Sequence, residues 1–326
     1  MKNYIVSIAL ALITGCIGFF SGKYFERSGK VETPLDTIDK TKELRLGGYK
    51  LINPLLECDN FHPSKILSSL ELHKKVKSFI ENAKSTGRAS HISFYYRDLT
   101  NGPWIGIGEK DDFSPASLLK VPVMIAAFKK AENDPGFLKK KIRYDEDLNK
   151  GIIPNIKDSV IKIGNSYSVE ELINFMIVHS DNNARLLLFQ NIEQTFITRV
   201  FTDIGIDMTY FDDRKDFMSV KTYSSFFRIL YNATYLNKGN SEKALQILTN
   251  SSFHQGLPAQ LPEKVLVAHK FGERGYTNSE IKQLHDCGIV YKGNRPYLIC
   301  VMTKGTNTLE LSNIIAELSS LVYLMN

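Results

Sequence analysis

Two blocks of strand-like sequence, separated by a long segment with helical patterns, constrain the fold of this chain more than any other feature. The first block is HISFYYRDLTNGPWIGIG at residues 91–108, in which two β-rich runs flank a Leu-Thr-Asn-Gly-Pro turn signature. The second block, residues 265–303, contains VLVAHKFG, CGIVY and PYLICVMT, with a turn at Lys292-Gly293-Asn294. Strands joined by tight turns pair antiparallel. The sequence therefore predicts one antiparallel sheet whose two parts lie far apart along the chain.

Helical patterns surround both blocks. Residues 67–84 (LSSLELHKKVKSFIENAK) predict an amphipathic helix with Leu67, Leu70, Val76 and Ile80 on one side. Residues 311–325 predict a C-terminal helix with one apolar face, formed by Leu311, Ile314, Ile315, Leu318, Leu321 and Val322.

Most of the segment between about residues 130 and 250 is also helical in pattern, and Ser168 with Glu171 predicts a capping box. We therefore expect an α+β fold: a five-stranded antiparallel sheet flanked by N- and C-terminal helices, with an inserted all-helical subdomain.

The N-terminus differs from the rest of the chain. Lys2 precedes an uncharged run of 17 residues from Tyr4 to Phe20, at the short limit of a membrane span and longer than a usual signal-peptide core. A buried soluble helix is the alternative. Ile13-Thr14-Gly15-Cys16 also matches a lipoprotein cleavage box, although the apolar residues after Cys16 argue against lipidation. We expect residues 1–30 to be an export signal retained as a membrane anchor, residues 31–66 a linker, and residues 67–326 one domain on the extracytoplasmic face of the cell envelope.

Charge and cysteine content exclude several function classes. The net charge is only +6 and the basic residues form no stripe, so no nucleic-acid partner is expected. Cys58, Cys287 and Cys300 have neither CxxC nor metal-ligand spacing, and we expect them to be small buried residues. The seven histidines form no HExxH motif. We therefore expect no metal and no cofactor. We also expect the protein to be a monomer.

A serine and a lysine stand together in the apolar stretch FSPASLLKVPVMIAAF, residues 113–128. Their spacing places Ser117 and Lys120 on the same side of a helical turn, and Pro122 predicts that this turn is irregular. Serine needs a base to act as a nucleophile, and a desolvated lysine beside a second cation is neutral enough to serve. The motif is weak by itself, because a second copy at Ser279 and Lys282 stands in a polar setting where we expect no function.

Two later motifs change the interpretation. Ser180, Asp181 and Asn182 lie between two apolar runs, where buried polar groups require partners. His269-Lys270-Phe271-Gly272 ends a strand, and its glycine allows a close approach of the backbone. Read alone, the segment from His269 to Gly272 fits a strand end with a snorkelling lysine better than a functional site.

In this order, the three motifs resemble those of the penicillin-recognising serine hydrolases, which include class A β-lactamases and penicillin-binding proteins of the transpeptidase type. The resemblance implies that Ser117 is the acylated nucleophile, Lys120 its base and Ser180 a proton shuttle. It further implies that Asn182 and Lys270 bind substrate and that Asp181 is structural. The backbone N–H groups of Ser117 and Glu273, beside Gly272, would form the oxyanion hole.

Two departures from the family pattern affect the expected activity. The loop that carries the deacylating glutamate of class A β-lactamases is short here, YFDDRKDFMS, and Asp216 is the one local substitute for that glutamate. We expect Asp216 to be a surface residue whose pKa is lowered by Arg214 and Lys215. Phe271 stands where the family has a hydroxyl that binds the substrate carboxylate.

The resemblance implies an exported serine hydrolase, of β-lactamase or DD-peptidase type, that forms an acyl-enzyme with β-lactams or peptidoglycan D-alanyl peptides. The missing glutamate favours slow deacylation. Two alternatives remain: a membrane-anchored penicillin-binding receptor that is acylated without turnover, and a catalytically idle protein that binds the cell wall.

Overall fold

The computed structural model describes residues 44–45, 47–57, 66–100, 104–148, 160–206, 216–276 and 279–326. The expected N-terminal anchor and linker residues 31–43 lie outside these ranges, as do Cys16, Cys58, Arg214 and Lys215. Within the described ranges, no helix combines the length and the apolar character needed to cross a membrane.

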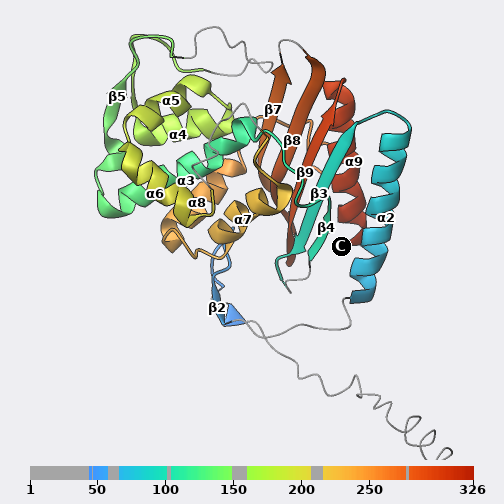
Figure 1. Cartoon of the computed structure of the whole chain (residues 1–326). Coiled ribbons are helices and arrows are strands. Elements are labelled where there is room, and N and C mark those ends of the chain that lie inside the picture. The colour runs from blue at the N-terminus through green and yellow to red at the C-terminus, as the bar shows by residue number, and fades with distance from the viewer. Residues whose placement is uncertain are drawn as a thin grey trace, which may run out of the picture. The chain divides into compact units, whose positions relative to one another are not determined.

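The central sheet has five antiparallel strands in the order β4-β3-β9-β8-β7 (Figure 1). They are β3 (His91–Asp98), β4 (Trp104–Ile107), β7 (Leu266–Tyr276), β8 (Ser279–Lys292) and β9 (Arg295–Gly305). β3 pairs with β9 along its whole length, from His91 opposite Lys304 to Asp98 opposite Tyr297. The two blocks of strand sequence thus form one sheet, which confirms the predicted fold class.

Helices α2 (Ile66–Ser85) and α9 (Thr308–Met325) cover one face of this sheet (Figure 1). Val76 and Ile80 of α2 are buried as expected. Leu70 is 50% exposed, however, and Leu72 is buried in its place, so that part of the prediction was wrong. Residues 72, 76 and 80 repeat at the four-residue spacing of one helical face, and residue 70 lies off that face.

A mostly helical subdomain faces the other side of the sheet; we expected it to be all-helical, but it also contains two short paired strands. It contains η3 (Ala116–Leu119), α3 (Lys120–Asn133), η4 (Phe137–Lys139), α4 (Val169–Val178), α5 (Asn182–Gln190), α6 (Gln194–Asp203), α7 (Val220–Tyr231) and α8 (Lys238–Leu248), with a small hairpin of β5 (Lys141–Arg143) and β6 (Ser166–Ser168). Helix α4 begins with the predicted capping box of Ser168 and Glu171. A continuous apolar cluster joins α3 and α4 to the strands, including Met124 and Ile289, and this buried boundary positions the site.

Residues that we assigned to the linker pack against the domain. Strands β1 (Leu44–Arg45) and β2 (Leu55–Glu57) flank Leu51 and Ile52, both buried. The backbone N–H groups of these two residues donate to the Glu242 carboxylate, and the Tyr291 hydroxyl donates to the carbonyl of Leu51. Around these residues, therefore, the linker is not a free tether.

Candidate active site

Ser117 lies in the short 3₁₀ helix η3, immediately before α3 begins at Lys120. This is the irregular first turn that Pro122 predicted. Ala116, next to the serine, has a φ of 47°, and Ser180 across the site has a φ of 56°. Left-handed backbone is unfavourable for residues other than glycine and is found preferentially at functional sites. Both hydroxyl-bearing segments are thus held in unusual conformations.

A continuous chain of hydrogen bonds joins the three motifs. Lys120 Nζ donates to Ser117 Oγ at 2.9 Å and to Ser180 Oγ at 3.0 Å, and it also bonds the Ser180 carbonyl. On the far side of Ser180, Lys270 Nζ donates to the same hydroxyl at 3.0 Å. Ser117 and Ser180 are half-buried whereas both lysines are buried. The two serines are therefore partly accessible to solvent, whereas the two lysines are not.

Burial governs the charge of both lysines. Desolvation lowers the pKa of Lys120 well below its ordinary value, and repulsion from Lys270 and Arg185 lowers it further, against the opposing effect of Asp181. Desolvation also lowers the pKa of Lys270 to about 7, although Asp286 opposes this shift. When Lys120 is neutral, its Nζ has a lone pair, and the Ser117 hydroxyl can donate to it across the same 2.9 Å in place of accepting from it. The site therefore holds a hydroxyl and a candidate base in hydrogen-bonding contact.

The remaining residues of the second motif have separate roles in the geometry. Asn182 Oδ1 accepts a hydrogen bond from Lys120 Nζ at 2.8 Å, so its amide belongs to the network. Asp181 is buried and caps α5 by accepting from the N–H of Ala184 at 2.9 Å. It also accepts from the N–H of Ile161 at 2.8 Å. Asp181 is structural, as the resemblance implied.

Gly272 brings the edge strand β7 against η3. A Cβ atom at this position would lie 2.9 Å from the carbonyl oxygen of Pro115 and 3.1 Å from the nitrogen of Leu118. Any other residue would push β7 away from the nucleophile. Glu273 follows Gly272 directly on the same strand. Its backbone N–H as an oxyanion-hole donor stays a prediction of the resemblance.

Phe271 fills the position of the expected hydroxyl with a buried aromatic ring. The ring stacks on Phe253 at a centroid separation of 4.2 Å and belongs to the apolar cluster on the α9 side of the sheet. Lys270 Nζ lies 3.9 Å from the centroid of the Phe271 ring. Phe271 thus provides a cation–π contact to Lys270 in place of a hydrogen-bonding group.

Asp216 is exposed, as expected, and both of its carboxylate oxygens are engaged. Its Oδ1 accepts from Gln283 Nε2 at 3.0 Å, and its Oδ2 pairs with Lys304 Nζ at 2.6 Å. Burial raises its pKa, but these contacts outweigh burial and lower the pKa overall. The expected direction is correct, and the described residues that lower the pKa are Lys304, Gln283 and Ser114, the last through its backbone.

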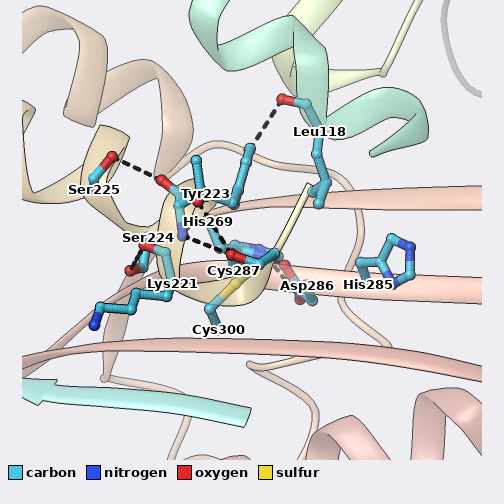
Figure 2. The surroundings of a disulfide bond; sticks show 12 residues. Leu118, Lys221, Tyr223, Ser224, Ser225, His269, His285, Asp286, Cys287 and Cys300 are labelled. Carbon is cyan, nitrogen blue, oxygen red and sulfur yellow. Dashed lines mark hydrogen bonds and ion pairs between the residues drawn. A yellow bond between two sulfur atoms is a disulfide. The ribbon is translucent and has the colours of Figure 1, made fainter. Parts of the chain in front are cut away.

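Cys287 and Cys300 form a disulfide between β8 and β9, as Figure 2 shows. Both are buried, as expected, and the bond between them was not predicted from the sequence. They face each other in the register of β8 and β9, at equal distances from the middle of the turn at Gly293 and Asn294. Lys270 is the neighbour of Cys287 across β7 and β8, which places the disulfide beneath the site.

Several contacts near the site were not predicted from the sequence. The Tyr223 hydroxyl of α7 donates to the carbonyl of Leu118 at 3.1 Å (Figure 2). Gln283 and His285 of β8 bond the backbone of Ser114, before the nucleophile. No sequence motif marks these three residues. The contacts of Gln283 and His285 depend on the register of β8, which a local pattern does not show. The second Ser-x-x-Lys pair, Ser279 and Lys282, lies at the exposed start of β8 and takes no part in the site.

Comparisons with known proteins agree with this geometry. The model of the Beta-lactamase enzyme family matches residues 71–325. The β-lactamase VEB-1 of Pseudomonas aeruginosa is 22% identical over 232 residues, which cover 65% of this chain and 77% of that protein.

Among solved structures, the TLA-3 extended-spectrum β-lactamase has a TM-score of 0.69 at 20% identity, covering 78% of this chain and all of that one. A PBP-A variant in an acyl-enzyme complex with penicillin G has a TM-score of 0.66 at 20% identity, covering 78% of this chain and 96% of that one. At these identities, the likeness to solved structures concerns the fold alone. The family model matches most of the chain, and the matched residues include all three motifs. The chain belongs to the Beta-lactamase enzyme family.

Proposed function

We propose that this protein is a membrane-tethered serine hydrolase of the cell envelope that forms an acyl-enzyme with β-lactams or peptidoglycan D-alanyl peptides and releases it slowly. The observation that carries the proposal is the chain of hydrogen bonds from Ser117 through Lys120 and Ser180 to Lys270. A serine bonded to a buried lysine with a lowered pKa is an activated nucleophile.

Acylation follows from this geometry. Ser117 Oγ attacks the carbonyl carbon, and its proton passes to the lone pair of Lys120 Nζ. When the tetrahedral intermediate collapses, the carbon–nitrogen bond breaks and Lys120 returns the proton through Ser180 Oγ to the leaving nitrogen. Asn182 Oδ1 is bonded to Lys120, which directs the N–H end of the amide towards a substrate carbonyl.

Slow deacylation is supported by the state of Asp216. Hydrolysis of the acyl-serine requires a base that holds a water beside the ester carbonyl. Both carboxylate oxygens of Asp216 already accept hydrogen bonds from Gln283 and Lys304, and its pKa is lowered. We therefore assign Asp216 a structural role, and the acyl-enzyme is expected to accumulate.

The Cys287–Cys300 disulfide supports export, because structural disulfides persist in oxidising compartments. The apolar run of residues 4–20 is the proposed anchor. Cell fractionation followed by intact mass analysis tests this assignment. A membrane-bound chain with its N-terminus retained supports the uncleaved anchor, a lipid-modified chain that begins at Cys16 supports a lipoprotein, and a chain found only in the cytoplasm contradicts both.

Intact-mass measurement of the full-length chain with penicillin G, followed over time, tests the proposed activity. Ring opening retains every atom of the penicillin, so the adduct adds the full mass of the ligand. Ser117→Ala should abolish the adduct, whereas Ser279→Ala, in the exposed second Ser-x-x-Lys pair, should retain it. A penicillin adduct that persists in Ser117→Ala contradicts the assignment.

The time course separates the alternatives. An adduct that forms and decays over a period much longer than acylation supports the slow hydrolase. An adduct that never decays supports the receptor that is acylated without turnover. If neither penicillin G nor a D-alanyl peptide gives an adduct, the protein is a catalytically idle relative.

A further inference from the structure

Two buried side chains of β8 hold the backbone of Ser114, three residues before the nucleophile. Gln283 Oε1 accepts a hydrogen bond from the N–H of Ser114 at 3.1 Å. His285 Nε2 lies 3.0 Å from the carbonyl oxygen of the same residue. Gln283 is 2% exposed and His285 is fully buried. The peptide groups on both sides of Ser114 are thus fixed by residues from a strand far away in the sequence.

The surroundings of His285 determine its tautomer. The backbone N–H of Thr303 donates to His285 Nδ1 at 3.2 Å, so Nδ1 has no proton and Nε2 carries it. His285 Nε2 therefore donates to the Ser114 carbonyl. Burial lowers the pKa of His285 to about 4, which keeps the ring in this neutral form near neutral pH.

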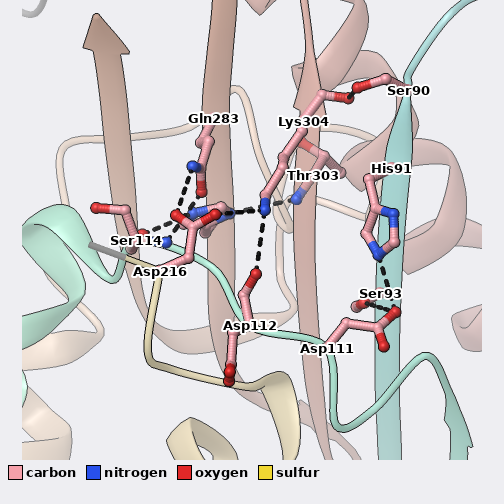
Figure 3. Close-up of polar contacts among 11 residues, drawn as sticks. Ser90, His91, Ser93, Asp111, Asp112, Ser114, Asp216, Gln283, Thr303 and Lys304 are labelled. Carbon is pink, nitrogen blue, oxygen red and sulfur yellow. Dashed lines mark hydrogen bonds and ion pairs between the residues drawn. The ribbon is translucent and has the colours of Figure 1, made fainter. Parts of the chain in front are cut away.

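Asp216 orients the Gln283 amide, as Figure 3 shows. Because Gln283 Nε2 donates to Asp216 Oδ1, its Oε1 is turned towards Ser114. Asp216 is held in turn by Lys304, whose Nζ also donates to the carbonyl of Asp112 at 3.1 Å. These contacts connect the end of the shortened loop to the chain that leads into the nucleophile.

The strained turn at Ala116 needs such support. Left-handed backbone costs a non-glycine residue about 1–2 kcal/mol. Only Pro115, with a φ of −66°, separates Ala116 from the clamped Ser114. On the other side of that clamp, Phe113 exchanges backbone hydrogen bonds with Met218. The turn is therefore built on a segment whose polar backbone groups are anchored.

We propose that Gln283 and His285 are positioning residues for acylation: by clamping Ser114 they hold Ala116 in its left-handed conformation, and so aim the hydroxyl and the N–H group of Ser117 at the substrate carbonyl. Neither residue touches the reacting atoms. The proposal rests on the proposed acylation of Ser117. It extends that function by identifying what holds the nucleophile in place.

Acylation kinetics test the clamp. In the full-length chain, Gln283→Met and His285→Leu each remove one bond to Ser114, whereas His285→Gln retains a donor for its carbonyl. Ser319→Ala is the matched control. Ser319 lies in α9, on the other face of the sheet, and the substitution removes the buried hydrogen bond from its hydroxyl to the carbonyl of Leu257. The rate of adduct formation at several penicillin G concentrations separates the apparent dissociation constant from the acylation rate constant.

A positioning role predicts a fall of about 10- to 100-fold in the acylation rate constant of Gln283→Met and His285→Leu, with the dissociation constant within about two-fold of wild type. His285→Gln should recover most of the rate, and Ser319→Ala should keep it. If the folded Gln283→Met and His285→Leu variants acylate within two-fold of wild type, or if Ser319→Ala loses as much rate as they do, the proposal is wrong.

Amide hydrogen exchange is a second readout that does not depend on acylation. Residues 113–119 should exchange faster in Gln283→Met and His285→Leu than in wild type or Ser319→Ala. Unchanged exchange in this segment would also overturn the clamp. If the wild-type chain forms no adduct, the proposed function fails, and hydrogen exchange still decides whether the clamp holds the turn.

Discussion

Lys270 should make the stability of the protein depend on pH in a defined direction. Burial lowers its pKa in the folded chain from 10.5 to about 7, against the opposing effect of Asp286. Between these two values the unfolded chain holds a proton that the folded chain has released. The unfolded state then binds more protons, so the free energy of unfolding rises with pH above about 7 and this contribution is lost as pH falls to 7.

The size of this effect follows from the same shift. Each pH unit between the folded and unfolded pKa values contributes about 1.4 kcal/mol. From pH 7 to pH 9, two units within this window, Lys270 should therefore add about 3 kcal/mol. No reduction for solvent screening applies, because the side chain is fully buried. Lys270→Met removes the titrating group, so the variant should have its largest advantage over wild type at pH 7 and below.

Urea unfolding of wild type and Lys270→Met at pH 6, 7, 8 and 9 measures this difference. The lowered pKa of Lys120 also makes the free energy of unfolding rise with pH, in wild type and in Lys270→Met alike. Repeating the comparison in proteins that carry Lys120→Met removes the electrostatic coupling between the two lysines. The difference in unfolding free energy should be flat from pH 6 to 7 and should then change by about 3 kcal/mol up to pH 9. A difference that stays constant to within 1 kcal/mol over the whole range would refute the reasoning.

Three further substitutions test the chemistry of the site. Lys120→Met should lower the acylation rate constant for penicillin G by about 10²- to 10⁴-fold while circular dichroism shows a retained fold, because it removes the base; a loss of only a few-fold would mean that another group takes the proton. Asp216→Asn keeps an acceptor for Gln283 and should change the lifetime of the penicillin adduct, followed by intact mass, by less than a few-fold; rapid turnover in wild type that disappears in the variant would make Asp216 the deacylating base. Phe271→Thr restores a hydroxyl and should increase the preference for acylation by penicillin G over its methyl ester about ten-fold. The lost stacking on Phe253 should lower the free energy of unfolding by about 3 kcal/mol. An unchanged preference would show that this position does not recognise the carboxylate.

Most of the secondary structure and the chemical groups of the site could be predicted from the sequence. Helical and strand periods depend on neighbouring residues, so the capping box of Ser168 and Glu171 and the turn at Gly293 are visible in the sequence. The three motifs could be found for the same reason, since each is short and lies within one element or at its end. The order of the motifs also indicated the family, and the family resemblance implied that Ser117, Lys120 and Lys270 lie close together.

The charges and contacts that surround those groups could not be predicted, because they depend on the folded arrangement of the chain. The partners of Asp216 are Lys304 and Gln283, which sequence neighbours could not indicate. The clamp of Ser114 by His285, like the hydrogen bond from the Leu51 N–H to Glu242, depends on how segments far apart in sequence are aligned. A shift of one residue in the register of β8 would turn His285 to the opposite face of the sheet. Such contacts arise when side chains from separate elements are buried together, and local sequence patterns carry no information about that alignment.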